Sequence, residues 1–402
     1  MNFTIPPPLP LGLYVHVPWC IRKCPYCDFN SHALGGTPLI SQETLPEAAY
    51  LRALVTDLEQ ELLTVRGRQV STIFIGGGTP SLLSPAGIDQ LLTEFHARLP
   101  IANNAEVTLE ANPGTVDAIR FKGFKAAGIN RLSLGIQSFH DGCLVRLGRI
   151  HGHAEALAAF EMARRAGFDN INLDLMFGLP GQDLEDAQAD LVTAITLEPE
   201  HISYYQLTLE PHTAFHRNPP PLPDDDTQWA MQEQGISLLA AAGYAQYEIS
   251  AYSRPDRCCR HNLNYWEFGD YLGIGAGAHG KVTDVDGIRR RWKVRNPQDY
   301  LTGIKNYPAT KNQHIAGDEP VTADDLPVEF MLNALRLVAG VPTVLYTQRT
   351  GLPLAHLTHQ LITARSQGWL EHRENRLMPT VKGRRFLNDL LELFLPDDSN
   401  HK

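Results

Sequence analysis

The sequence predicts an α/β protein, built as a partial (β/α) barrel with a mainly helical C-terminal domain. Through the first two-thirds of the 402 residues, apolar runs rich in β-forming residues alternate six times with segments of helical periodicity. Repeated βα units of this length predict a parallel sheet with right-handed crossovers, and six of them suggest a partial or complete barrel. The alternation then stops, and helical periodicity returns near the C-terminus, so we expect a second domain there.

Each expected element of the barrel has its own signal. The strands are short apolar runs, expected at Leu13–Val17, Thr72–Ile75, Glu106–Leu109, Arg131–Ile136, Ile171–Met176 and His201–Leu209. The helices between them repeat apolar residues every three to four positions, at Glu47–Val65, Leu82–Arg98, Val116–Ala127, His153–Ala166 and Leu184–Leu197. Gly128 and Gly167 directly follow two of these helices, where a left-handed C-terminal cap is common.

Beyond the barrel the pattern changes. Pro219–Pro223 predicts a loop, and Asp225 or Asp226 is expected to cap a helix that begins near Thr227. We expect a strand at Tyr244–Tyr252 and then a polar, irregular connection over residues 284–320. Helices should follow at Val328–Val338 and Leu352–Gln367, then a hairpin at Trp369–Met378 and a final helix at Val381–Leu395. We therefore divide the chain into a barrel core (1–240), a barrel extension with connection (241–320) and a helical C-terminal domain (321–402).

Composition excludes several classes of protein. The formal net charge of −10 has the wrong sign for a protein that binds nucleic acid, and residues 321–402 carry nine basic and nine acidic side chains, without a basic excess. No apolar run reaches the length of a membrane span, and Met1–Pro10 lacks the features of a secretory signal. Six cysteines are too few for a disulfide scaffold, so the reducing cytoplasm is the expected compartment.

Three cysteines lie just beyond the first expected strand, as Cys20, Cys24 and Cys27 in a C-x3-C-x2-C pattern. Three neighbouring thiolates can hold a [4Fe–4S] cubane and leave one iron open to a small chelating molecule. A zinc site completed by His32 is the alternative, because three cysteines and one histidine are an ordinary structural zinc set. The spacing is unusual for a zinc knuckle and favours the cluster.

A glycine-rich turn and four polar residues mark the C-terminal ends of the expected strands. In Gly76–Pro80, three glycines allow the backbone to approach a ligand closely, and the absence of a following Lys-Ser/Thr excludes a P-loop. The polar residues should meet at one mouth of a parallel barrel, where ligands bind. Their side chains can pair with charged groups and bind hydroxyls, and they are Glu110, Gln137, Arg149 and Asp174.

Together these features resemble the radical S-adenosylmethionine superfamily, in which three cysteines hold a [4Fe–4S] cluster. In that family the methionine amino and carboxylate groups chelate the fourth iron, and reductive cleavage yields a 5′-deoxyadenosyl radical. The resemblance makes Gly76–Pro80 the motif that contacts the methionine amino group, and it places Tyr26 against the adenine. The residues that it assigns to S-adenosylmethionine are Tyr14, Tyr26, Gly77, Gly78, Thr79, Glu110, Gln137, Arg149 and Asp174.

Longer phrases narrow the resemblance to the oxygen-independent coproporphyrinogen III oxidase-like family, and within it to heme chaperones of the HemW type. They are Tyr14–Cys20, Glu110–Gly114, Ser133–Phe139, Leu147–His151 and Asn172–Met176. Two departures from the oxidase favour the chaperone. Phe29 stands where the oxidase carries a further cysteine, and nineteen residues before Cys20 leave no room for the oxidase's long N-terminal extension. Oxidative decarboxylation of coproporphyrinogen III is the alternative activity.

The segment from His261 to Trp266 matches the HNxxYW motif of that group, so the resemblance makes His261 and Tyr265 candidate heme ligands. Cys258 is an alternative ligand. The expected cofactors are therefore a [4Fe–4S] cluster, S-adenosylmethionine and heme. The expected partners are a heme-acceptor protein and an electron donor, with no nucleic acid and no membrane span.

Two further motifs are expected to carry no chemistry. The basic stretch Arg289–Arg295 predicts a solvated face more readily than a site for heme propionates or an acidic partner. Gly273–Gly277 resembles a dinucleotide fingerprint, but the residues after it predict a strand instead of the helix whose N-terminus would hold the phosphate.

Overall fold

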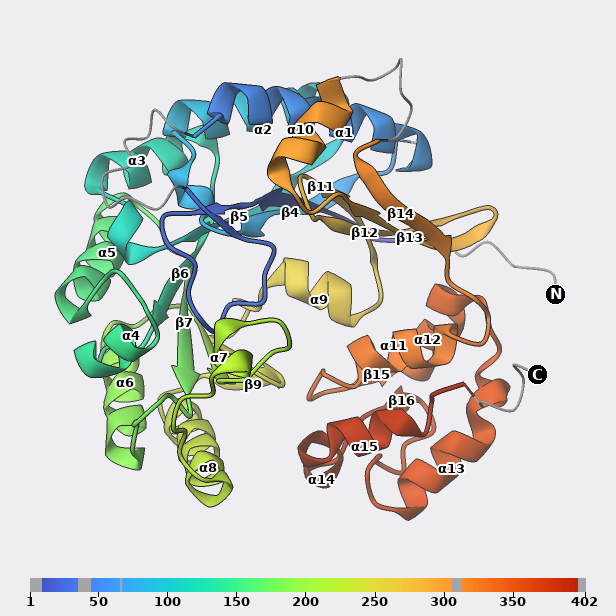
Figure 1. The fold of residues 1–402 in the computed structure, drawn as a ribbon. Coiled ribbons are helices and arrows are strands. Elements are labelled where there is room, and N and C mark those ends of the chain that lie inside the picture. Colours follow the sequence, from blue (N-terminus) through green and yellow to red (C-terminus); the bar gives the residue numbers. More distant parts are fainter. Residues whose placement is uncertain (1–8, 35–44, 66, 306–312, 397–402) are drawn as a thin grey trace.

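The fold is built on a twelve-stranded sheet whose central strands are parallel and curve into an open barrel (Figure 1). A computed structural model describes residues 9–34, 45–65, 67–305 and 313–396. The barrel strands, in sheet order, are β1 (Leu11–Val17), β4 (Val70–Gly77), β5 (Ile101–Ala111), β6 (Arg131–Gln137), β7 (Ile171–Phe177) and β8 (His201–Gln206). Every neighbouring pair among them is parallel, which confirms the α/β fold class and its six βα units.

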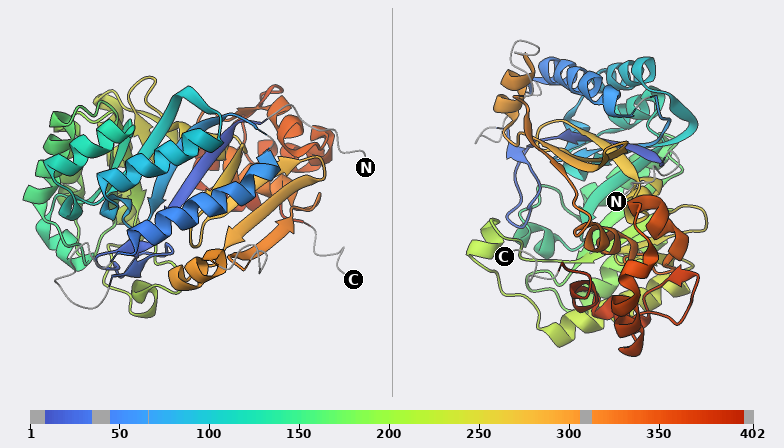
Figure 2. Two further views of the ribbon diagram at one scale, coloured as in Figure 1. Left: turned by 90° about the horizontal axis from the view of Figure 1, so that it is seen from above. Right: turned by 90° about the vertical axis from the view of Figure 1, so that its right-hand side faces the viewer.

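Helices cover the outer face of the barrel, and seen from above they lie over its strands (Figure 2). They are α1 (Glu47–Val65), α2 (Pro85–Arg98), α3 (Ala118–Ala127), α5 (His153–Arg165), α6 (Leu184–Thr196) and α8 (Asp225–Ala241). Helix α2 begins three residues later than expected, because a 3-10 turn at Pro80–Leu82 precedes it. The cap of α8 is Asp224, not Asp225 or Asp226 as expected, since its side chain accepts from the amide of Thr227.

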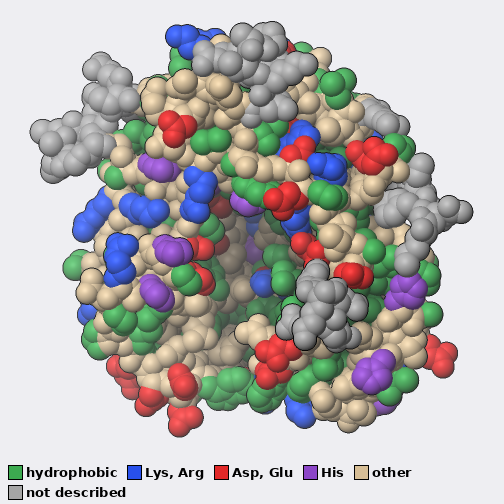
Figure 3. Space-filling view, turned by 45° about the vertical axis from the view of Figure 1, so that its right-hand side comes forward, with side chains coloured by type: hydrophobic (Ala, Val, Ile, Leu, Met, Phe, Trp, Pro, Cys, Tyr) green, Lys and Arg blue, Asp and Glu red, His purple; other side chains and the backbone are tan. Residues whose placement is uncertain are grey.

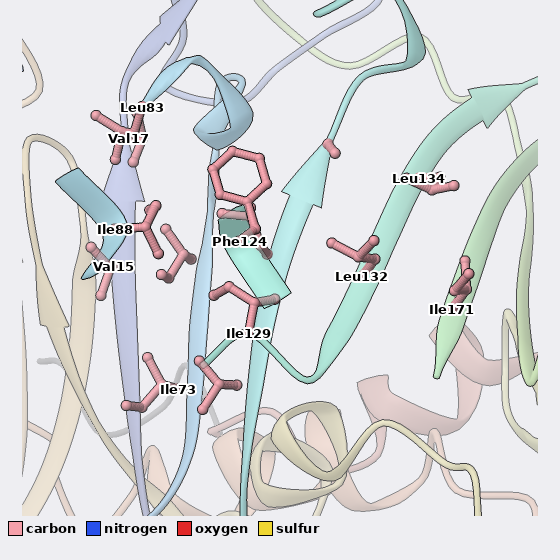
Figure 4. Close-up of a cluster of buried hydrophobic side chains, with 14 of the residues drawn as sticks. Val15, Val17, Ile73, Leu83, Ile88, Phe124, Ile129, Leu132, Leu134 and Ile171 are labelled. Atoms are coloured by element: carbon pink, nitrogen blue, oxygen red, sulfur yellow. The ribbon is translucent and has the colours of Figure 1, made fainter. Parts of the chain in front are cut away.

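The main core lies between the sheet and these helices. Along β1, Leu13, Val15 and Val17 are fully buried and point toward the helices, where they pack with residues such as Ile73 and Ile88 (Figure 4). Strand side chains alternate between faces, so the intervening residues point into the barrel. The barrel interior is polar, and Asn172 bonds there to the imidazole of His201 at 2.6 Å. The interior therefore holds a hydrogen-bonded network in place of an apolar core.

The sheet continues past β1, through strands that include the one expected after Gly277 and then into residues 284–320, where we expected an irregular connection. β11 (Asp270–Ile274) pairs parallel with β1, and β12 (His279–Asp284), β13 (Gly287–Lys293) and β14 (Ile315–Pro320) extend the sheet with antiparallel pairs. The expectation for 284–320 was wrong because charged side chains along β13 hide its strand character. Arg291 pairs with Glu61 and Asp318, so this basic stretch is not the solvated face that its composition suggested.

Three other elements differ from expectation. The strand expected at Tyr244–Tyr252 is a hairpin of β9 (Ala245–Glu248) and β10 (Ala251–Ser253), turned at Ser250, whose amide bonds to Glu248. The helix expected at Leu352–Gln367 begins instead at Thr358, as α13 (Thr358–Ser366). The expected final helix is interrupted at Phe386, which separates α14 (Val381–Arg385) from α15 (Leu387–Glu392).

The C-terminal helices have an apolar core of their own, centred on Phe330, Leu335 and Tyr346. The helices before α13 are α11 (Leu326–Ala334) and α12 (Thr343–Thr350). Two short strands, β15 (Val341–Pro342) and β16 (Arg376–Leu377), pair with each other and so connect the hairpin region to these helices. Figure 1 shows this group of helices beyond the open side of the barrel, next to the extended sheet. No helix among the described residues is long and apolar enough to cross a membrane.

Candidate functional site

The three cysteines of the sequence motif line one cavity of about 470 Å³ at the C-terminal ends of the barrel strands. The space-filling view shows the open side of the molecule hollowed at its centre (Figure 3). Of the residues assigned to S-adenosylmethionine, all but Tyr14 line the same cavity as the thiols: Tyr26, Gly77, Gly78, Thr79, Glu110, Gln137, Arg149 and Asp174. Residues from the four strands β4, β5, β6 and β7 thus meet at one mouth, as the barrel rule predicted, together with residues of the adjoining loops.

The cysteine loop is held at both of its ends. β2 (Trp19–Cys20) pairs with β3 (His32–Ala33), which closes the segment between Cys20 and Ser31 into a loop. The glycine turn holds the loop from the other side, since the amide of Gly78 donates to the carbonyl of Val17 and that of Thr79 to the carbonyl of Trp19. A Cβ at Gly78 would lie 2.6 Å from the Trp19 carbonyl oxygen, so the close approach requires glycine.

The donor set fits an iron–sulfur cluster. All three thiols are free, and burial raises the pKa of the Cys20 thiol, so a bound metal would have to displace its proton. Arg149 places Nη1 3.6 Å from the sulfur of Cys24, while its buried Nε has no partner. Among the described residues, no three His, Cys, Asp or Glu side chains converge on a single metal ion. A cubane takes each protein ligand on a different iron, so three separate cysteine thiolates suit it.

The zinc alternative takes His32 as its fourth ligand. The Nε2 of His32 already lies within hydrogen-bonding distance of the side-chain oxygen of Asn30, at 3.2 Å.

Glu110 is a buried carboxyl that faces the glycine turn. Its Oε2 accepts a hydrogen bond from the amide of Gly77 at 3.0 Å. Burial, together with the nearby carboxyl of Asp174, raises the pKa of Glu110 to about 8. No cation among the described residues forms an ion pair with this carboxyl, and a ligand that brings an amino group would supply one.

We predict that Glu110→Gln stabilises the free protein at alkaline pH while weakening S-adenosylmethionine binding. The raised pKa means that the folded state disfavours the ionised carboxyl. Stability is therefore lost as the pH rises from about 4.5, where the unfolded carboxyl ionises, to about 8. The substitution should add about 1–3 kcal/mol to the free energy of unfolding at pH 9 and little at pH 4. Urea unfolding at both pH values, with exposed Glu319→Gln as control, tests this, and equal gains at both would contradict it.

The other polar residues of the cavity hold one another in place. Gln137 has a positive φ of 71°, which is uncommon for a residue other than glycine, and its side chain accepts from the hydroxyl of Tyr205 at 2.8 Å. Asp174 accepts from Ser133 at 2.9 Å, and Arg149 donates to the carbonyl of Gly135 at 2.7 Å. These bonds set the positions of the side chains before any ligand arrives.

Sequence reasoning missed several residues of this cavity. Tyr205 and Ser203 lie on β8, and the rule that ligands bind at the C-terminal ends of barrel strands would have found them. Arg336 follows α11 in the C-terminal domain, where it pairs with Glu248 at 2.9 Å. No local signal marks that residue, because only the packing of the C-terminal helices brings it to the barrel.

The HNxxYW segment is a helix, α9 (Arg260–Trp266), on the concave side of the barrel (Figure 1). Only 1% of His261 is exposed. Its Nδ1 bonds to the hydroxyl of Thr72 at 2.8 Å, and its Nε2 bonds to the hydroxyl of Tyr265 at 2.7 Å. Burial and the charge of Arg131 lower the pKa of His261 to about 3. Both nitrogens of this neutral imidazole are therefore occupied by protein partners.

A second cavity, of about 550 Å³, lies beside the first, and we call it the aromatic cavity. It occupies the concave face of β1 and the β11–β13 extension, where α9 and α11 border it. Its walls are aromatic and basic, with Tyr14, Phe29, Tyr265, Trp266, Phe268, Tyr271, His279, Lys281, Arg290 and Arg295 among the lining residues. Phe29 and Trp266 also line the cysteine cavity, so these two side chains stand between the two spaces.

The predicted site residues therefore divide between two neighbouring spaces. Tyr14 and Tyr265 line the aromatic cavity, and His261 lies beneath Tyr265 without lining either space. Cys258 lines neither, and its sulfur lies 3.3 Å from the hydroxyl of Ser253.

Comparisons with known proteins agree on the family. Residues 14–192 match the model of the radical SAM superfamily, and residues 321–386 match the HemN C-terminal domain. "Heme chaperone HemW" of Escherichia coli (strain K12) is 50% identical over 389 residues, covering 96% of this chain and 99% of that protein. "Heme chaperone HemW" of Bacillus subtilis (strain 168) is 34% identical, covering 95% and 98%.

A solved structure shares the fold. Coproporphyrinogen III oxidase (HemN) from Escherichia coli, described as a radical SAM enzyme, aligns with a TM-score of 0.80 at 23% identity, over 96% of this chain and 90% of that one. At this identity the likeness concerns the fold alone. The sequence identity to the curated relatives extends over nearly the whole chain and decides the family. This chain belongs to the HemW group of the radical SAM superfamily.

Proposed function

We propose that this protein is a heme chaperone, which binds heme and transfers it to an acceptor protein in the cytoplasm. We include in the proposal a [4Fe–4S] cluster on Cys20, Cys24 and Cys27 with S-adenosylmethionine on its open iron. The observation that carries the proposal is the aromatic cavity beside the cysteine cavity, with Tyr265 and Trp266 of the HNxxYW motif in its wall. The relatives named heme chaperones support the same assignment.

The shape and chemistry of the aromatic cavity suit a porphyrin. A volume of about 550 Å³ lies within the usual range for small-molecule sites. Aromatic side chains offer flat apolar surface to a macrocycle, and basic side chains at the same site can pair with its carboxylates.

The cysteine cavity suits the cofactor pair. When bound, the cluster supplies an electron that can cleave the sulfonium of S-adenosylmethionine. The chain itself would bind the amino group through Glu110 and the backbone of the glycine turn, and the carboxylate through Arg149. Gln137 and Asp174 offer acceptors for ribose hydroxyls, at positions that their own hydrogen bonds already hold. An electron donor for the cluster belongs to this proposal.

The proposal is tested by anaerobic titration of hemin into the protein with its cluster reconstituted. We expect a saturable shift of the Soret band with an end point near one heme per chain. The same sample should release no carbon dioxide from coproporphyrinogen III in the presence of S-adenosylmethionine and a reductant. Carbon dioxide release without a specific heme spectrum would overturn the chaperone function in favour of oxidative decarboxylation.

A further inference from the structure

The aromatic cavity contains several side chains of the types that bind heme iron, and most of them are already engaged. His16 bonds to the Tyr14 hydroxyl through Nδ1 and to the carbonyl of Asn30 through Nε2, both at 2.8 Å. The hydroxyl of Tyr265 bonds to His261. Ligation of iron by any of these groups would break a buried hydrogen bond, which costs about 1–3 kcal/mol.

Tyr271 and Lys281 are engaged as well. The hydroxyl of Tyr271 accepts from Arg290 at 3.3 Å, and burial raises its pKa, so the phenolate needed for ligation is disfavoured. Lys281 is buried and pairs with Asp270 at 2.9 Å. Neither side chain is available to iron without losing a partner.

His279 differs from all of these groups. It begins β12, lines the cavity and is exposed to solvent. Its ring stacks on the indole of Trp292, with the two planes 14° apart and their centroids 6.1 Å apart. Neither of its ring nitrogens makes a hydrogen bond within the described part of the chain. A neutral imidazole can bind heme iron through one ring nitrogen, and His279 can do so without breaking a hydrogen bond to the described part of the chain.

A cation suited to a propionate lies at the same site. Arg295 lines the cavity and is exposed, and its guanidinium pairs with no group among the described residues. Its backbone is fixed, because its carbonyl accepts from the side chain of Asn30 at 2.8 Å. Arg290, by contrast, already pairs with Glu329 of α11 at 2.9 Å. This ion pair links the cavity wall to the C-terminal helices.

From this arrangement we infer that the aromatic cavity is the heme site, with His279 as the iron ligand and Arg295 as the partner of a propionate. The inference rests on the proposed function and names an iron ligand other than those that the family resemblance implied. His261 becomes a positioning residue, which holds the Tyr265 hydroxyl at the cavity wall through its 2.7 Å bond. The heme would then lie next to the S-adenosylmethionine cavity, separated from it by Phe29 and Trp266.

The test is anaerobic hemin titration of the full-length, cluster-reconstituted protein as wild type and as His279→Ala. His359→Ala is the matched control, since His359 is an exposed histidine that lines a different cavity, in the C-terminal domain. We expect His279→Ala to bind hemin at least about tenfold more weakly, which corresponds to 1.4 kcal/mol. Its magnetic circular dichroism should lose the histidine-ligated signature, and added imidazole should restore that signature. Arg295→Ala should weaken binding without changing the ligand signature.

The possible outcomes separate the two proposals. If wild type shows no specific hemin spectrum, the chaperone function itself fails. If wild type binds and His279→Ala binds equally well with the same spectrum, the chaperone function stands and the ligand assignment is wrong. A loss in His279→Ala that imidazole does not restore would also overturn ligation. A loss of the histidine signature in His261→Ala, rescued by imidazole, would return the iron to His261.

Discussion

Replacement of any one of Cys20, Cys24 and Cys27 by alanine is expected to abolish the iron–sulfur cluster. Each thiol lines the cysteine cavity, and a cubane that keeps one open iron has no ligand to spare. After anaerobic reconstitution, the wild type should hold about four irons and four acid-labile sulfides per chain. Each variant should fall to the background of a protein without a site, and the visible absorption of the cluster should disappear.

Cys258→Ala is the matched control for that experiment. Cys258 is a free, partly exposed cysteine outside the motif, and its sulfur lies 3.3 Å from the hydroxyl of Ser253. This variant should retain the full iron and sulfide content. Retention of the cluster by the Cys24→Ala protein, or its loss from the control, would contradict the assigned ligands. Zinc without sulfide in the wild type would favour the zinc alternative.

Lys293→Met is expected to destabilise the fold by about 3–5 kcal/mol, because it leaves the buried carboxylate of Asp57 without its lysine partner, while Glu61 keeps its pair with Arg291. The side chain of Lys293 is 1% exposed, and its Nζ lies 2.6 Å from Asp57 and 2.5 Å from Glu61 of α1. Asp57 in turn accepts from the amide of Gly275 at 3.0 Å and from the hydroxyl of Tyr300 at 2.8 Å. This cluster joins α1 to the sheet extension that carries the aromatic cavity.

Urea unfolding at pH 7 measures the loss. Arg165→Ala is the control, since Arg165 and Glu161 form an exposed ion pair on one helix. Such a pair should contribute no more than about 0.5 kcal/mol. The double variant Asp57→Asn/Lys293→Met should be more stable than Lys293→Met alone, because it removes the uncompensated charge. A single-variant loss below about 1 kcal/mol would show that the buried carboxylate finds another partner.

The same cluster makes stability depend on acid pH. Burial alone would raise the pKa of Asp57, but Lys293 and His314 outweigh it and hold the pKa at about 2. Because this value lies below that of the unfolded carboxyl, the contribution of Asp57 is complete above about pH 4. It is lost as the pH falls toward 2. Lys293→Met should therefore flatten the decline of stability over that range.

The sequence by itself determined the features that depend on local pattern. Strand and helix periods differ, so six βα units could be read from apolar spacing, and α1 has the expected bounds at Glu47–Val65. The cysteine loop and the glycine turn are each contiguous, so their chemistry is visible within a few residues. The rule that parallel strands end at one mouth was enough to bring Glu110, Gln137 and Asp174 to the same cavity.

Only the tertiary structure decided the arrangement of the aromatic cavity. Tyr14, His279 and Leu332 line it together although they are far apart in the sequence, because β11 pairs with β1 and the C-terminal helices pack beside that edge. The strand character of β13 was hidden by arginines whose partners lie on other elements, such as Glu61 and Glu329. The burial of His261 was equally invisible, since Thr72, its Nδ1 partner, comes from a distant strand. Long-range packing decides which side chains remain free to bind a ligand, and no local period in the sequence records it.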